Sequence, residues 1–271
     1  MRRIIYRVKS LIPESIWKRI TAPYWWWYNR VRHQVAAVYD RRLAKSQREL
    51  SRFRDIHRED RCFILGNGPS LKRTDLHLIS NEYTFGMNRI YLLFPELGWE
   101  TSYYVSINTL VIEQCRLDIS RLAIPRFITW RGRRWVNGEG IYFLDTDYLD
   151  PADFAQDIRG RVFEGSTVTY VALQIAYYMG FGEVILIGVD HSFTSKGRPN
   201  ETVVSEGDDP NHFSSEYFGK GFTWQLPDLD ASEQAYRLAK AAFEMDGRRV
   251  LDATVDGKLK VFEKVDYQSL F

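Results

Sequence analysis

Cysteine is scarce in this chain of 271 residues. The two cysteines, Cys62 and Cys115, form no CxxC motif and no Cys/His spacing of a zinc site, so the sequence supports neither a disulfide scaffold nor a structural metal. No run of 18 or more apolar residues occurs, and the N-terminus lacks the apolar core and cleavage site of a secretory signal. We therefore expect a cytoplasmic protein that neither spans a membrane nor leaves the cell by the secretory route.

Charge is unevenly distributed, although the formal net charge is only +2. Residues 1–61 hold 16 Lys/Arg against 6 Asp/Glu, whereas the rest of the chain holds 21 against 29, and four of the eight tryptophans lie in the basic part. Indole rings and cations favour an anionic membrane surface, so residues 1–58 predict a basic, aromatic helical extension that contacts the inner face of the cell membrane. The alternative is that its aromatic residues pack on the protein itself. No RNA-binding motif is visible, and we expect no nucleic-acid partner.

A glycine-rich turn follows the first apolar run of residues 59–271. The run Cys62–Leu65 stops at Gly66-Asn67-Gly68-Pro69-Ser70, and polar, helix-like sequence follows. Gly66 and Gly68 can adopt φ > 0 and let the backbone approach an anion, while Pro69 and Ser70 suit the first turn of a helix. The turn is therefore a candidate phosphate-binding loop for a nucleotide, the alternative being a tight turn without a ligand.

Apolar runs alternate with helical patterns through the rest of this region. Runs at 83–87, 102–107, 126–130, 140–144, 184–189 and 249–254 predict strands, and 35–58, 165–180 and 229–246 predict helices. The alternation predicts an α/β fold: a single Rossmann-like domain over 59–271, with a mainly parallel sheet flanked by helices. Residues 192–228 are irregular and rich in glycine and proline, which is typical of a lid.

Polar residues follow several of the predicted strands, where open parallel sheets bind ligands. Asn88 and Asn108 come directly after the second and third strands, and Asp190 and His191 follow the run 184–189. An asparagine amide can hydrogen-bond a base, a ribose or a phosphate without adding charge. Asp190 is a single carboxylate, which could hold either a loop or a metal.

A second anion site is predicted where an apolar helix begins after Gly165-Ser166-Thr167. Ser166 or Thr167 would cap that helix, and the N–H groups of its first turn would attract a phosphate.

Taken together, the chain's motifs resemble the 6-hydroxymethylpterin pyrophosphokinase MptE-like family over about residues 60–270. These motifs include Gly66–Leu71, Asn88, Asn108, Gly165–Thr167 and Gly188–Asp190. The general frame is also similar to that of bacterial lipooligosaccharide sialyltransferases, which use a CMP-sugar on a Rossmann-like domain without a metal. The second resemblance implies that Asn67, Asn88 and Asn108 contact the nucleotide. It places the catalytic base at Lys220, with His191 and His212 as nearby alternatives.

Three functions fit these observations. The leading hypothesis is a transferase with a nucleotide-activated donor, most plausibly a CMP-sugar-dependent glycosyltransferase of cell-surface polysaccharide biosynthesis. We expect it to act on a glycan or lipid-linked acceptor and to need no cofactor. The alternative is 6-hydroxymethyl-7,8-dihydropterin pyrophosphokinase activity, which needs ATP and magnesium, although neither a P-loop lysine nor a clear pair of aspartates is present. A non-enzymatic nucleotide-binding protein at the membrane surface is the third.

Overall fold

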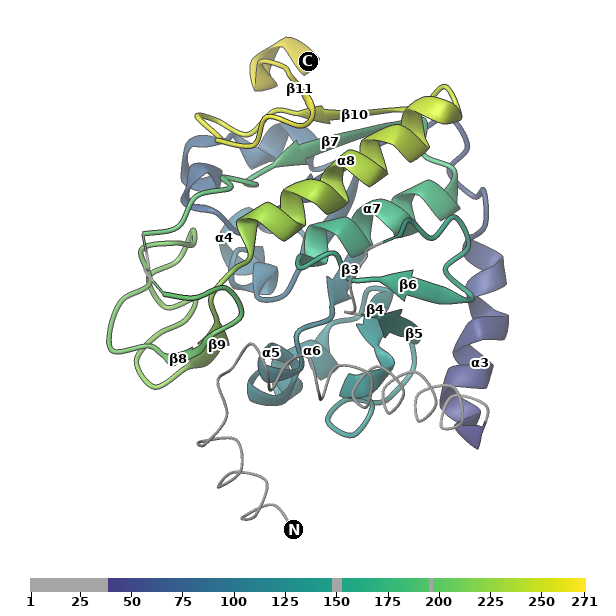
Figure 1. The fold of residues 1–271 in the computed structure, drawn as a ribbon, viewed down its shortest axis with the longest axis horizontal. Helices are drawn as coiled ribbons and strands as arrows, with labels where there is room; N and C mark the ends of the chain where they lie inside the picture. Colours follow the sequence, from purple (N-terminus) through teal and green to yellow (C-terminus); the bar gives the residue numbers. More distant parts are fainter. Residues whose placement is uncertain (1–38, 148–152, 195–196) are drawn as a thin grey trace, which may run out of the picture. The chain divides into compact units, whose positions relative to one another are not determined.

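A parallel sheet forms the centre of the fold. The structure is a computed structural model, and it describes residues 39–147, 153–194 and 197–271. Within these ranges the sheet has nine strands in the order β11-β10-β7-β1-β2-β3-β4-β5-β6, and every neighbouring pair is parallel (Figure 1). The strands are β1 (Arg61–Leu65), β2 (Tyr83–Met87), β3 (Tyr103–Ser106), β4 (Arg126–Thr129), β5 (Ile141–Asp147), β6 (Arg161–Phe163), β7 (Glu183–Ile187), β10 (Arg249–Asp252) and β11 (Glu263–Lys264).

The central strands are continuous apolar runs because both faces of the sheet are covered. In β1 the four residues after Arg61 are buried, and β7 repeats this pattern after Glu183. The helices are α3 (Arg41–Glu49), α4 (Phe94–Leu97), α5 (Thr109–Gln114), α6 (Arg116–Arg121), α7 (Val168–Met179) and α8 (Leu229–Met245). The predicted α/β fold with its mainly parallel sheet is confirmed.

Helix α7 is apolar on all sides because it is buried on all sides. Every residue from Thr169 to Met179 is buried, and α7 lies beside α8 against the sheet (Figure 1). Its one interior amide, Gln174, is fully satisfied: the Oε1 atom accepts from the N–H groups of Ala155 and Phe163 at 3.0 and 3.1 Å, and Nε2 donates to the Phe163 and Tyr170 carbonyls. Gln174 thereby fixes β6 beside the helix.

Two segments differ from the prediction. The glycine-rich turn leads not into an α-helix but into two 3₁₀ turns, Pro69–Arg73 and Leu76–Ile79, because the connection to β2 is short and buries residues at irregular spacing. Within the described part, 39–58, of the helix predicted over 35–58, α3 is α-helical and is followed by a 3₁₀ turn, Leu50–Phe53; Asp55 and Glu59 then adopt positive φ. The predicted contacts of residues 1–38 lie outside the described residues. No helix in the described ranges is long and apolar enough to cross a membrane.

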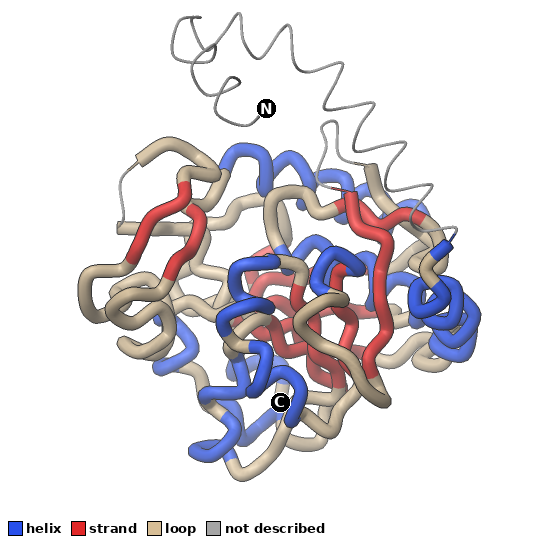
Figure 2. The backbone as a smooth tube through the Cα atoms, turned by 90° about the horizontal axis from the view of Figure 1, so that it is seen from below, coloured by secondary structure: helices blue, strands red, loops and turns tan. Residues whose placement is uncertain are grey.

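The segment expected to be a lid contains a small sheet of its own. Strands β8 (Thr202–Val204) and β9 (Thr223–Gln225) pair antiparallel. Figure 2 shows this pair standing apart from the central strands. Its place on the protein brings β9 to the edge of the site described next.

Candidate functional site

The site begins at the point where the chain reverses its direction of travel across the sheet. Strand β1 lies between β2, which follows it, and β7, which is added much later in the chain. The turns that leave β1 and β7 are bonded to each other: the Gly66 N–H donates to the Ile187 carbonyl at 2.7 Å, and the Gly68 N–H donates to the Gly188 carbonyl at 2.9 Å. Such a switch point leaves a crevice beyond the strand ends, where open α/β sheets bind ligands.

Both glycines of the turn are needed because the backbone of the turn after β7 lies very close to them. They are not needed for positive φ, as the sequence suggested. Neither has positive φ, and Gly68 is extended at φ −70° and ψ 160°. A Cβ on Gly66 would lie 2.5 Å from the Gly188 carbonyl carbon, and a Cβ on Gly68 would overlap the Asp190 carboxylate. The turn therefore admits only glycine because a neighbouring turn occupies the space.

Asp190 fastens this turn. Its carboxylate accepts from the Ser70 hydroxyl at 2.6 Å and from the Ser70 N–H at 3.2 Å. Ser70 is consequently buried and is not among the residues that line the cavity, whereas Gly66, Asn67 and Gly68 are. Of the two roles open to Asp190, the geometry fits that of holding the loop.

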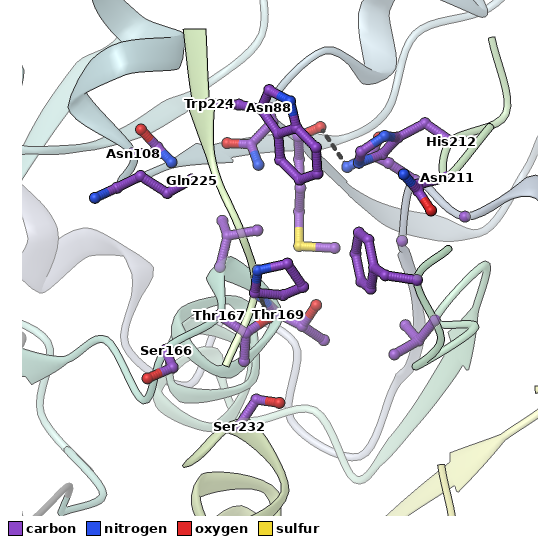
Figure 3. A pocket seen from close by; sticks show the side chains of 18 of the residues that line it. Asn88, Asn108, Ser166, Thr167, Thr169, Asn211, His212, Trp224, Gln225 and Ser232 are labelled. Atoms are coloured by element: carbon purple, nitrogen blue, oxygen red, sulfur yellow. Dashed lines mark hydrogen bonds between the residues drawn. The ribbon is translucent and has the colours of Figure 1, made fainter. Parts of the chain in front are cut away.

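A cavity of about 710 Å³ occupies the crevice. This volume lies in the range of small-molecule sites. The ends of β1, β2, β3 and β7, the start of α7, one face of α8 and the segment 192–227 all contribute to its wall. Figure 3 shows amide side chains at one end and the hydroxyl-bearing Ser166, Thr167, Thr169 and Ser232 at the other.

The three predicted asparagines all line this cavity, but they present different groups to it. The Asn88 Oδ1 accepts from the Ser106 hydroxyl at 3.0 Å, and the Asn108 Oδ1 accepts from the Leu110 N–H at 2.9 Å as the cap of α5. Their NH₂ groups have no partner within the described chain. Asn67 is the reverse: its Nδ2 donates to the Met87 carbonyl at 3.2 Å, and its buried Oδ1 has no partner there. These assignments follow from the hydrogen-bond network.

The first turn of α7 forms the opposite end. Of the two predicted caps, Thr167 is the cap, because its hydroxyl accepts from the Thr169 N–H at 3.3 Å. Gly165 and Ser166 precede it with positive φ, and Ser166 lines the cavity while Gly165 does not. The Tyr236 hydroxyl from α8 contacts the Thr167 hydroxyl at 3.3 Å. Hydroxyl and N–H groups therefore face the ligand space where α7 starts.

His212 is held as one half of a His–Asp pair. Its Nδ1 lies 2.7 Å from Oδ2 of Asp209, whose side chain is almost fully buried. A carboxylate only accepts hydrogen bonds, so the Nδ1 atom carries the proton and Nε2 is left as an acceptor. The ring also stacks on Tyr217, with centroids 4.0 Å apart and planes 6° from parallel.

His191 lies in the same cavity with a different environment. It has φ 52°, and its Nε2 is 3.6 Å from Oε2 of Glu233 on α8. Burial lowers the pKa of His191, and the Glu233 carboxylate acts in the opposite direction. Within the described residues no group of three or more His, Cys, Asp or Glu side chains is arranged to hold a metal ion.

Comparison with known proteins gives the family. The family model for 6-hydroxymethylpterin diphosphokinase MptE-like proteins matches residues 41–196. The chain belongs to this MptE-like family. The match confirms the resemblance drawn from the motifs.

Two solved structures are similar to this MptE-like chain. The Maf glycosyltransferase of Magnetospirillum magneticum AMB-1 aligns with TM-score 0.50 and 13% identity over 85% of this chain and 39% of that one. A mammalian sialyltransferase in complex with Gal-beta-1-3GalNAc-ortho-nitrophenol aligns with TM-score 0.34 and 14% identity over 87% and 85% of the two chains. A search of curated proteins found no significant match. At these identities the first likeness shows the fold, and the chain spans about two fifths of that glycosyltransferase.

Lys220 lies apart from His191 and His212, the other two candidates for the catalytic base in this MptE-like chain. It is exposed and does not line the cavity, so the structure brings His191 and His212 to the ligand space and leaves Lys220 outside it. Asp209 and Tyr236 were not among the predicted site residues. Arg131 was not among them either, and it lines the cavity in an ion pair with Glu164. The spacing Asp209-x-x-His212 is the one signal that could have indicated a pair.

Proposed function

We propose that this protein is a transferase that uses a nucleotide-activated sugar, with a CMP-sugar as the favoured donor. The observation that carries the proposal is one cavity lined by three strand-end asparagines, the capped start of α7 and a His–Asp pair. Neutral amides suit a base and ribose, the helix start suits a phosphate, and the histidine suits a proton acceptor.

The amide end complements a nucleoside. The NH₂ groups of Asn88 and Asn108 can donate to carbonyl or ring-nitrogen acceptors of a base, while the buried Oδ1 of Asn67 can accept from an amino or hydroxyl group. A buried acceptor without a partner costs about 1–3 kcal/mol, which a ligand donor would recover on binding. Pyrimidine nucleosides offer both kinds of group.

The charges in the cavity favour a donor with a single phosphate. Among the described lining residues, Arg131 is the one Arg or Lys, and it is paired with Glu164. The N–H groups at the start of α7 can stabilise one negative charge. A diphosphate carries more charge than these groups neutralise, so a nucleoside monophosphate is the better leaving group for this site.

His212 would act as the base. Its Nε2 would take the proton of an acceptor hydroxyl while the oxygen forms a bond to the anomeric carbon of the donor sugar. The bond from that carbon to the phosphate oxygen breaks at the same time, and the nucleotide leaves with the electron pair. The Thr167 and Tyr236 hydroxyls, together with the start of α7, would stabilise the charge on the departing phosphate.

The name of the family favours a second candidate, transfer of diphosphate from ATP to a hydroxymethylpterin. That reaction requires Mg²⁺, which usually binds through one or two carboxylates and the phosphates. The carboxylates that line the cavity in the described chain are Asp190, which holds Ser70, and Glu164, which pairs with Arg131. This donor set fits Mg²⁺ poorly, so we place this function second.

The basic N-terminal part would bring the enzyme to lipid-linked acceptors at the inner face of the cell membrane. Liposome co-sedimentation of the whole chain and of a variant without residues 1–30 tests this idea. Loss of binding to anionic vesicles in the shortened chain supports it, and equal binding of the two proteins refutes it.

A direct test compares the two reactions. The protein is incubated either with CMP-linked sugars and a panel of glycan acceptors or with ATP, Mg²⁺ and 6-hydroxymethyl-7,8-dihydropterin, and products are identified by mass spectrometry. We expect sugar transfer that is lost in His212→Asn and kept in His77→Asn, which alters an exposed histidine outside the cavity. Diphosphate transfer instead would select the second function, and nucleotide binding without any product would indicate a non-enzymatic protein.

A further inference from the structure

Arg89 joins the nucleotide end of the cavity to the loop that carries His212. It directly follows Asn88 at the end of β2, so the two side chains share a backbone segment. The Arg89 Nη1 atom donates to the Glu216 carbonyl at 2.8 Å and also to the Tyr217 carbonyl. The Arg89 backbone N–H donates to the Tyr217 hydroxyl at 3.3 Å. Three hydrogen bonds thus connect Arg89, just beyond the end of β2, to two residues far along the chain.

The contacts indicate a geometric role for Arg89 and not a charge-pairing one. Within the described chain Arg89 forms no ion pair with a carboxylate. Its guanidinium lies 5.9 Å from the Tyr217 ring centroid and 5.1 Å from that of Phe222. The planar fork of arginine can serve a carbonyl and stack on aromatic rings at once, which lysine cannot do.

Tyr217 passes this restraint to the catalytic candidate. It is 1% exposed, and its ring is the one stacked on His212. Burial raises the pKa of Tyr217, which therefore stays a neutral hydroxyl. Asp209 holds the edge of the His212 ring, and Tyr217 holds its face. Arg89 is therefore connected to the imidazole through Tyr217.

The loop that carries His212 is also bonded to Asn67, the predicted nucleotide-binding asparagine in the glycine turn. The N–H of Phe213, the residue after His212, donates to the Asn67 carbonyl at 2.9 Å. Asn67 and Asn88 are therefore each linked to the His212 loop, one directly and one through Arg89.

We propose that Arg89 is a positioning residue, which sets the orientation of His212 through Tyr217 and couples it to the backbone that carries Asn88. The proposal rests on the proposed function of the cavity, although its first test needs no ligand. Because a displacement of about 1 Å at a catalytic group can cost 100-fold in rate, loss of this support should lower turnover much more than donor binding.

The first test observes His212 directly. Protein labelled with ¹⁵N-histidine contains five histidines, and His212→Gln identifies the His212 signals. At slightly alkaline pH, where neutral imidazole predominates, we expect the wild type to show one tautomer with the proton on Nδ1. Arg89→Lys and Tyr217→Leu should each give a mixture of tautomers. Tyr217→Phe is the matched control, because it keeps the stacked ring and the main-chain carbonyl and should resemble the wild type.

A kinetic test follows with the CMP-sugar donor. Arg89→Lys should lower kcat by about 10–100-fold while KM for the donor changes by less than about threefold.

A wild-type His212 spectrum in both Arg89→Lys and Tyr217→Leu would overturn the proposal, because Asp209 alone would then fix the ring. Absence of nucleotide binding and turnover in the wild type would instead refute the proposed function, so the two failures are distinguishable. If Arg89→Lys does not fold, the Tyr217→Leu spectrum decides.

Discussion

Adding one methyl group to the glycine turn tests the architecture of the site most simply. In Gly66→Ala the new Cβ would lie 2.5 Å from the Gly188 carbonyl carbon and 2.9 Å from the Val189 nitrogen, both backbone atoms that cannot rotate away. The turns after β1 and β7 must separate, which strains the hydrogen bonds from the Gly66 and Gly68 N–H groups. Overpacking costs about 1–3 kcal/mol and each of the two weakened hydrogen bonds about 1 kcal/mol, so we expect a loss of about 3–5 kcal/mol in the free energy of unfolding.

Gly68→Ala meets a different obstacle. Its Cβ would overlap the Asp190 carboxylate, a side chain that can be removed by mutation. The cost of Gly68→Ala should therefore be smaller in an Asp190→Ala background than in the wild type, by at least about 1 kcal/mol in a double-mutant cycle. No such relief is expected for Gly66→Ala, because its obstacle is backbone.

Urea unfolding followed by circular dichroism measures both effects. Gly207→Ala is the control, since its Cβ would meet nothing within 4 Å and its φ is not positive; its stability should stay within about 0.5 kcal/mol of the wild type. Gly66→Ala as stable as Gly207→Ala would refute the close approach of the two turns. Equal costs of Gly68→Ala with and without Asp190 would refute the role of that carboxylate.

Four further predictions follow from individual contacts. Asn88→Asp keeps the bond from Ser106 but replaces a donor by a charged acceptor, so CMP affinity measured by calorimetry should fall at least about tenfold with Tm unchanged; undiminished affinity would exclude Asn88 as a donor. Asp209→Asn allows the wrong His212 tautomer and should lower kcat by about 100-fold or more, and a rate near wild type would contradict His212 as the base. Gln174→Leu leaves polar groups of Ala155 and Phe163 without partners, so urea unfolding should show a loss of about 3–5 kcal/mol, whereas a loss below 1 kcal/mol would deny the anchoring of β6. Burial lowers the pKa of His57, so below about pH 6.5 the unfolded state binds the proton more readily than the folded state, and stability decreases as the pH decreases. His57→Gln should flatten this dependence of Tm on pH, and His77→Gln should not.

The sheet could be predicted because its central strands are buried on both faces. Runs such as Cys62–Leu65 and Val184–Ile187 are apolar without alternation, and glycine ends the neighbouring helix at Gly180 with φ 92°. Strand β6 was missed because its three residues are held by Gln174, a contact from α7 that has no local pattern. The helix expected after Ser70 was wrong because the short connection to β2 closes as 3₁₀ turns.

Part of the site was predictable because strand order determines position. Asn67, Asn88 and Asn108 each follow a parallel strand, so their meeting at one edge of the sheet follows from the fold. Asp209 and Tyr217 come from the irregular segment, and Tyr236 comes from the middle of α8. Their contacts with His212 and Thr167 depend on tertiary packing, which the periodicity of one sequence does not report.

The most direct test of the central claim, that the cavity binds a nucleotide, is a thermal-shift screen of the whole chain. CMP, CDP, UDP, GDP and ATP are each added with Mg²⁺ or with EDTA. We predict that CMP raises Tm without Mg²⁺, by about 5–10 °C at 100 times its Kd. Stabilisation by Mg²⁺-ATP alone would favour the diphosphate transfer. No response to any nucleotide would contradict the account.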